Sequence, residues 1–145
     1  MNNKPKLKID SNGTKRWLLP NGNLHREDGP AVEYTDGTKC WCRNGKIHRE
    51  DGPAVEYANG YEEWWLNGKR HREDGPAVEW ADGSKFWYRN DKLHREDGPA
   101  AEYADGSKEW WLNGREYTEE EWMLHTLNNV DPKTRKAYKD ILSEL

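Results

Sequence analysis

One 23-residue unit is repeated four times, almost unchanged, between Asn21 and Leu112. The copies read NGNLHREDGPAVEYTDGTKCWCR, NGKIHREDGPAVEYANGYEEWWL, NGKRHREDGPAVEWADGSKFWYR and NDKLHREDGPAAEYADGSKEWWL. A fixed period of about 20 to 50 residues is typical of stacked-repeat proteins, in which each unit contacts its neighbours. Four copies offer similar surfaces in a row, so the repeat argues against a catalytic centre, which needs unlike groups in one place.

The composition favours a thin sheet over a ball. Only 33% of the 145 residues are hydrophobic, yet the chain has nine Trp and seven Tyr. Each of these side chains covers much apolar area while keeping a polar group near water. Such polarity is also typical of disordered chains, but the aromatic residues and the strict repetition argue against disorder. We therefore expect one elongated domain.

Charge and hydropathy exclude several classes of partner. The chain has 23 basic and 27 acidic residues, a net charge of -4, and both signs occur in every copy. This offers no basic field for nucleic acid or an anionic membrane. No apolar run approaches the length of a membrane span, and the start, MNNKPKLKID, lacks the apolar region of a signal peptide. We expect a cytoplasmic protein without membrane association.

Each copy predicts a β-hairpin, because AVEY is followed by Asp-Gly or Asn-Gly and then by a return strand. A two-residue loop would set Glu56 opposite Glu63. A three-residue loop sets Glu33 opposite Lys39, which is favourable because opposite charges across strands attract. We prefer the three-residue loop, although it sets Glu56 opposite Glu62 in the second copy, an exception that the sequence does not explain.

The chain divides into residues 1–20, an N-terminal half-repeat, residues 21–115, the four hairpin repeats, and residues 116–145, a helical cap. Thr118 and Glu121 form a capping-box pattern, and Asp131-Pro132 predicts a second helix start. We expect two helices that cover the last hairpin. The alternative is that the apolar stripe of the second helix docks a partner or a second copy. In that case the chain would form homo-oligomers through the sheet end or these helices.

Two aromatic columns recur side by side. The first is predicted to stack beside an Ala column, as with Ala31 opposite Trp41, and form the core; it contains Trp41, Trp64, Trp87 and Trp110. The second faces the other side of the sheet and contains Cys42, Trp65, Tyr88 and Trp111. We predict that a partner binds the row Trp65, Tyr88 and Trp111, with the loop arginines Arg49, Arg72 and Arg95. Such a row can stack nucleic-acid bases or bind protein. The negative net charge favours protein, and the alternative is that both columns are structural.

The His-Arg-Glu-Asp run of each copy carries groups that can bind metal or transfer protons. These runs recur about 10 Å apart if each copy adds two strands, whereas metal ligands lie about 2–2.5 Å from the ion. We predict instead an ion-pair ladder, in which the Arg of one copy reaches the Asp or Glu of the next. No metal, cofactor or catalytic residue is predicted. Cys40 and Cys42 are interpreted as reduced, apolar-like residues, because a bridge between such neighbours has poor geometry.

The columns resemble a known repeat family. The run from Tyr61 through Trp64 and Asn67-Gly68-Lys69 to His71 is similar to MORN-type repeats, and the resemblance covers about residues 11–115. The HREDGPAVE variant resembles bacterial and tailed-phage members. The chain departs from the family at Glu63, where the family has Gly, and after His71, where Arg-Glu-Asp makes the loop bulkier and more charged. The resemblance implies an elongated antiparallel sheet used in protein interaction or scaffolding. Phospholipid binding, also proposed for the family, fits the acidic balance poorly.

The leading functional hypothesis is a non-enzymatic β-repeat interaction module that binds one protein partner. The resemblance to phage proteins implies, by analogy, a modulator or inhibitor of a host system, acting in the host cytoplasm. Two alternatives stay open. One is a protein that sequesters a nucleotide-like small molecule between aromatic columns and loop arginines, and the other is a self-assembling structural scaffold.

Overall fold

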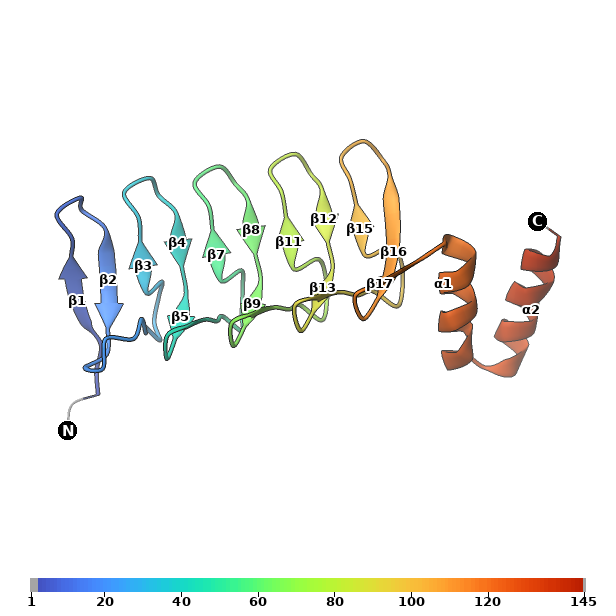
Figure 1. Cartoon of the computed structure of the whole chain (residues 1–145), viewed down its shortest axis with the longest axis horizontal. Coiled ribbons are helices and arrows are strands. Elements are labelled where there is room, and N and C mark those ends of the chain that lie inside the picture. The colour runs from blue at the N-terminus through green and yellow to red at the C-terminus, as the bar shows by residue number, and fades with distance from the viewer. Residues whose placement is uncertain (1–2, 145) are drawn as a thin grey trace.

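The computed structural model describes residues 3–144, which form an elongated strip of side-by-side β-hairpins followed by two helices (Figure 1). An 11-stranded antiparallel sheet runs along the strip in the order β1-β2-β3-β4-β7-β8-β11-β12-β15-β16-β17. The two ends of this order do not pair, so the sheet is open, and the predicted fold class is confirmed. The sheet strands are β1 (Lys6–Ile9), β2 (Lys15–Leu18), β3 (Val32–Glu33), β4 (Lys39–Cys40), β7 (Val55–Glu56), β8 (Glu62–Glu63), β11 (Val78–Glu79), β12 (Lys85–Phe86), β15 (Ala101–Glu102), β16 (Lys108–Leu112) and β17 (Arg115–Tyr117).

The hairpin register is the one that charge pairing favours. Glu33 lies opposite Lys39, and the Tyr34 N–H donates to the Thr38 carbonyl at 2.9 Å across a three-residue loop. The loop ends at Gly37, whose φ of 95° favours a residue without a Cβ. Its N–H donates back to the Tyr34 carbonyl at 3.1 Å. The predicted three-residue loop is therefore confirmed, with the same register in the later copies.

This register builds a row of charges across the sheet. Basic and acidic residues alternate from strand to strand except in the second copy, where Glu62 lies between Glu56 and Glu79. In strand order the row is Lys15, Glu33, Lys39, Glu56, Glu62, Glu79, Lys85, Glu102 and Lys108. Like charges on adjacent strands repel, so the second copy carries a local electrostatic cost that the other copies avoid.

A second, shorter hairpin follows each of the first three return strands, and it turns at an Asn-Gly or Asn-Asp pair. These hairpins are β5 (Cys42–Arg43) with β6 (Lys46–Ile47), β9 (Trp65–Leu66) with β10 (Lys69–Arg70), and β13 (Tyr88–Arg89) with β14 (Lys92–Leu93). Asn44 and Gly45 both have positive φ, 51° and 80°, which is the backbone of a type I′ turn and explains the Asn-Gly pair.

Histidines tie each of these turns to the preceding copy. The Asn44 N–H donates to His25 Nδ1 at 3.0 Å, and Nε2 of that ring faces Glu27 at 3.6 Å. A ring nitrogen that accepts carries no proton, so the proton lies on Nε2. The same bond recurs between Asn67 and His48, between Asn90 and His71, and between Asn113 and His94. This ladder gives a structural reason for the invariant spacing of His and Asn in the repeat.

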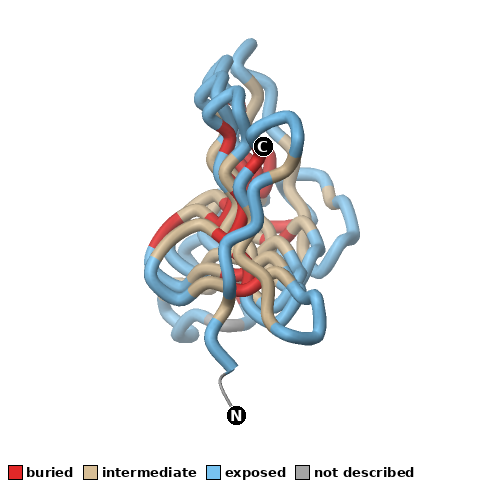
Figure 2. Tube along the Cα trace, turned by 90° about the vertical axis from the view of Figure 1, so that its left-hand side faces the viewer, coloured by how far each residue is buried: buried red, intermediate tan, exposed pale blue. Residues whose placement is uncertain are grey.

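Burial is concentrated along the middle of the strip. Viewed along its length, the buried backbone lies near the centre of the cross-section, and the hairpin tips are exposed (Figure 2). The small column is fully buried and consists of Ala31, Ala54, Ala77 and Ala100. On the opposite face the column Val32, Val55, Val78 and Ala101 is buried as well. The thin sheet therefore carries a narrow core on both faces.

The C-terminal cap consists of α1 (Glu119–Thr126), η1 (Leu127–Asn129) and α2 (Pro132–Ser143). The predicted capping box between Thr118 and Glu121 is present, and Asp131 caps α2. The Trp122 side chain, 8% exposed, donates from Nε1 to the Arg95 carbonyl at 2.9 Å. Helix α1 thus covers the last loop, at the position where a fifth repeat would continue.

Helix α2 differs from the prediction that both helices cover the last hairpin. It buries none of its residues, and Tyr138 and Ile141 are 46% and 57% exposed. The reason is steric, since α1 occupies the end of the repeats and α2 stands beside it on the outer side (Figure 1). Within residues 3–144 no helix is both long and apolar enough to cross a membrane.

Candidate functional site

The loop arginines are held inside the repeat. The Cζ atom of Arg49 lies 4.0 Å from the ring centroid of Trp41 in the preceding copy. Its Nε donates to Asp51 at 3.2 Å, and its Nη1 donates to the Pro53 carbonyl at 3.0 Å and to Glu56 at 3.3 Å. The stacked pairs Arg26 with Trp17, Arg72 with Trp64 and Arg95 with Trp87 have the same geometry at 3.8–3.9 Å.

The glycine of the HREDGP run makes room for this arrangement. Gly52 does not have a positive φ, but a Cβ on it would lie 2.9 Å from Arg49 Cζ, closer than van der Waals contact allows. The other copies are equally tight, at 2.8–3.0 Å. The glycine is therefore required for the close approach of the guanidinium group rather than for a turn.

This geometry corrects the predicted ion-pair ladder. Each loop arginine pairs with the Asp two residues later in its own loop, because stacking on the indole fixes the guanidinium there. Pairs between copies exist, but they come from other arginines. They join Arg43 to Glu50 at 3.6 Å, Arg70 to Asp91 at 2.7 Å and Arg89 to Glu96 at 3.9 Å.

The same geometry bears on the predicted partner-binding arginines. The side chains of Arg49, Arg72 and Arg95 are 20–24% exposed, whereas Asp51 in the same loop is 87% exposed. The loop edge, which we define as the four HREDGP runs, therefore presents carboxylates outward and keeps its arginines on tryptophan. Binding of a partner by these arginines stays a prediction, and it would have to displace internal contacts.

The predicted row Trp65, Tyr88 and Trp111 is half-buried. Indole Nε1 of Trp65 donates to Glu63 at 2.7 Å, and that of Trp111 donates to Glu109 at 3.0 Å. The Tyr88 ring packs against the core cluster of Val78, Phe86 and Ala101. These hydrogen bonds and packing contacts are internal to the sheet, which favours the alternative that both columns stabilise the fold. Their role in partner binding is still untested.

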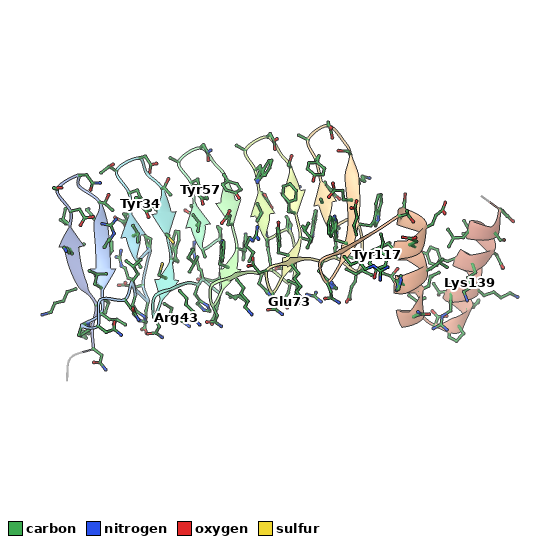
Figure 3. All side chains as sticks on the ribbon, viewed as in Figure 1. Tyr34, Arg43, Tyr57, Glu73, Tyr117 and Lys139 are labelled. Atoms are coloured by element: carbon green, nitrogen blue, oxygen red, sulfur yellow. The ribbon has the colours of Figure 1, made fainter. Side chains whose placement is uncertain are left out.

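A more exposed row of rings lies higher on the same face. Tyr34, Tyr57 and Trp80, each two residues after the first residue of a sheet strand, are 44%, 38% and 46% exposed. Tyr34 and Tyr57 project near the hairpin tips, whereas Arg43 and Glu73 lie toward the opposite edge (Figure 3). Ring contacts join Tyr57 to Tyr61 at 4.7 Å, Tyr61 to Trp80 at 6.5 Å, Trp80 to Phe86 at 5.1 Å, and Phe86 to Tyr103 at 5.4 Å.

We call Tyr34, Tyr57, Tyr61, Trp80, Phe86 and Tyr103 the aromatic row. Sequence reasoning missed it because the last residue of AVEY was assigned only to a strand. A signal was present, since this column holds Tyr or Trp in every copy, directly before the turn. A ring at that position extends past the buried centre of the sheet.

The aromatic row contains a shallow hollow at its centre. The hollow has a volume of about 420 Å³ and is lined by Asn59, Tyr61, Trp80, Ala81 and Asp82. The Tyr61 hydroxyl donates to Glu63. Burial and then this bond to a carboxylate raise the pKa of Tyr61 above its ordinary value.

Two larger grooves lie between neighbouring loops. One, of about 630 Å³, separates the first and second HREDGP runs and includes Arg43, and an equivalent groove of about 510 Å³ includes Arg89. Both are lined by acidic as well as basic side chains. Leu66 and Leu112 occupy the positions of these arginines in the second and fourth copies.

Metal binding and thiol chemistry both depend on how the side chains that carry them are placed. Within residues 3–144 no group of three or more His, Cys, Asp or Glu side chains is placed to hold a metal ion. Cys40 and Cys42 are free, with Sγ atoms 3.6 Å apart. Their contact and burial raise the pKa of Cys40, and the same contact lowers the pKa of Cys42.

A scan against protein-family models and a search of curated proteins found no match for this chain. The resemblance to MORN-type repeats therefore rests on the residues quoted for it, and it stays a prediction.

Proposed function

We propose that this chain is a non-enzymatic interaction module that binds one protein partner along the aromatic row. The observation that carries the proposal is the in-register exposure of Tyr34, Tyr57 and Trp80. Tyr61 links the rings of Tyr57 and Trp80. Contiguous exposed apolar surface is typical of interaction sites, and Tyr and Trp are enriched in protein interfaces. Such rings also contribute much of the binding free energy where they are buried by a partner.

The hairpin backbone that carries the aromatic row is suited to binding a partner. Tyr34, Tyr57, Trp80 and Tyr103 each directly precede a three-residue hairpin loop that is closed by backbone hydrogen bonds. Because the rings are held before a partner arrives, little conformational entropy is lost on binding. The proposal moves the contact surface from Trp65, Tyr88 and Trp111, which are half-buried, to the exposed rings above them on the same face.

Site-specific photo-crosslinking in the native cell tests the proposal. A photoreactive phenylalanine analogue replaces Tyr57 or Trp80, and control proteins carry it at Lys46 or Lys92, exposed positions at the other end of the hairpins. We expect a covalent adduct with one other protein from the first pair of positions and not from the controls. Adducts only with further copies of this chain, or equal labelling from all positions, would contradict the proposal.

The grooves beside Arg43 and Arg89 support a second candidate, the sequestration of a small anionic molecule. Native mass spectrometry of protein taken from its own cells distinguishes the two. A small added mass that is lost in an Arg43→Ser, Arg89→Ser double variant would favour sequestration. A co-purifying protein that is lost in Trp80→Ser would favour the interaction module.

A further inference from the structure

The hollow in the aromatic row is a feature of the second copy's own sequence. Tyr61 stands where the other copies have Thr38, Ser84 and Ser107, and Asn59 stands where they have Asp36, Asp82 and Asp105. The larger side chain at position 61 meets Trp80 of the next copy edge to face, at 6.5 Å and 75°. The repeat therefore makes this hollow once, at the boundary between the second and third copies.

The oxygens of the two polar side chains at the hollow, Asp82 and Asn59, accept hydrogen bonds from their own turns. Oδ1 of Asp82 accepts from the Ser84 N–H at 2.8 Å, and Oδ1 of Asn59 accepts from the Tyr61 N–H at 3.0 Å. These bonds fix both side chains in the lining of the hollow. The lining thus combines two aromatic rings with a carboxylate and an amide.

The chain binds its own arginines with the same components. At four places a guanidinium group stacks on an indole, 3.8–4.0 Å from the ring centroid, and donates from Nε to an Asp carboxylate. Trp80 has an exposed indole and a nearby Asp. Among residues 3–144, however, no arginine or lysine is stacked on it. A planar cation attracted by the ring face and paired with a carboxylate fits this combination.

The charge of the surrounding edge agrees with a cationic occupant. The tip loops read TDG, ANG, ADG and ADG, so they carry three exposed aspartates and no basic residue. The chain as a whole has a net charge of -4. A positively charged segment would be attracted to the tip edge over distances of about 8 Å at physiological ionic strength.

We propose that the hollow between Tyr61 and Trp80 accepts an arginine side chain of the protein partner. This inference rests on the proposed function and adds the chemistry of the group recognised. The arginine stacks on the Trp80 indole, with Tyr61 as the second wall, and its guanidinium donates to Asp82. The second and third copies together form the hollow, and the other rings of the aromatic row contact the neighbouring part of the partner.

The test uses the full chain and two short peptides, acetyl-Gly-Arg-Gly-amide and the same peptide with citrulline, which has nearly the same shape without the charge. Indole N–H resonances are followed by two-dimensional NMR, and that of Trp80 is assigned from a Trp80→Tyr variant. We expect a saturable shift of the Trp80 resonance with the arginine peptide and none with the citrulline peptide. Equal shifts with both peptides, as for a ligand that stacks without charge, or shifts confined to other indoles, would overturn the inference.

Two substitutions test whether Tyr61 contributes to binding of the arginine peptide. Tyr61→Ser, which gives the second copy the residue of the third and fourth, should weaken binding of the arginine peptide by about twofold to fivefold, the range of an exposed cation–π contact. Tyr138→Ser, at an exposed ring of α2 outside the aromatic row, is the control and should leave the affinity unchanged. If the arginine peptide does not bind while a photoreactive residue at position 80 still crosslinks to another protein, this inference is wrong and the proposed interaction module is supported. If neither is seen, both are wrong.

Discussion

The loop edge and the tip edge of the strip belong to the same repeat but treat their aromatic side chains in opposite ways. At the loop edge, each of Trp41, Trp64 and Trp87 is covered by an arginine of the following copy. At the tip edge, Tyr57 and Trp80 lie open to solvent. The columns that are identical in every copy join one repeat to the next. The columns that vary line the surface where we place the partner.

The loop edge also shows how basic and acidic side chains that are neighbours in sequence come to lie in different environments. Within each HREDGP run the basic and acidic residues are neighbours in sequence, yet the Arg is drawn onto an indole and the Asp is left outside. The loop edge therefore presents more acidic than basic side chains to solvent.

The largest expected effect compares one tryptophan from each edge. Trp64→Ala removes the ring beneath Arg72 and leaves a cavity beside Ala77, so we expect a loss of about 3 kcal/mol in the free energy of unfolding. Trp80→Ala, at a ring that is 46% exposed, should cost about 1 kcal/mol or less. Urea denaturation followed by circular dichroism measures both. Equal losses would remove the distinction between the two edges.

The two helices of the cap should also differ in how much they stabilise the protein. Trp122→Ala removes a buried indole and its bond to the Arg95 carbonyl, and should cost about 2–3 kcal/mol in the free energy of unfolding.

Deletion of 117–145 should expose the last hairpin further and promote oligomers. Deletion of 131–145 removes α2, which buries none of its residues, and should leave the monomer and its thermal midpoint nearly unchanged. A large loss from this shorter deletion would show that α2 stabilises the repeats.

A smaller effect is expected at the histidine ladder. His94→Ala removes a buried imidazole and leaves the Asn113 N–H without its acceptor, at a cost of about 1–2 kcal/mol. His125→Ala, at an exposed position of α1, is the control and should cost less than about 0.5 kcal/mol. Thermal denaturation of the two variants compares them. No difference between them would mean that the ladder does not stabilise the stack.

The smallest effect is a gain. Glu62→Lys restores the alternation of charge between Glu56 and Glu79, and should stabilise the protein by about 0.5–1 kcal/mol. Lys85→Glu creates the same defect in the third copy and should destabilise by a similar amount. Both effects should shrink in high salt, since the charges are accessible to solvent. A salt-independent change would point to packing instead.

Much of the frame could be predicted from the sequence because it depends on local chemistry. The Asp-Gly and Asn-Gly pairs predict turns, and the pairing of Glu33 with Lys39 selects the three-residue loop. The capping box at Thr118 predicts the start of α1. Each of these features depends on residues close together in the chain, where propensity and pairing decide the structure.

The tertiary structure alone decided which side chains are covered. Arg49 reaches Trp41 only because the HREDGP loop folds back across the face of the preceding copy, a path that no local propensity specifies. For the same reason Trp65 and Tyr88, predicted as an open row, lie lower on the face against other side chains, and the exposed rings are Tyr57 and Trp80. The sequence by itself determined the repeat, its hairpins and their register. Which rings stay exposed depended on how the side chains of one copy pack against the next, because burial is a property of neighbours distant in the chain.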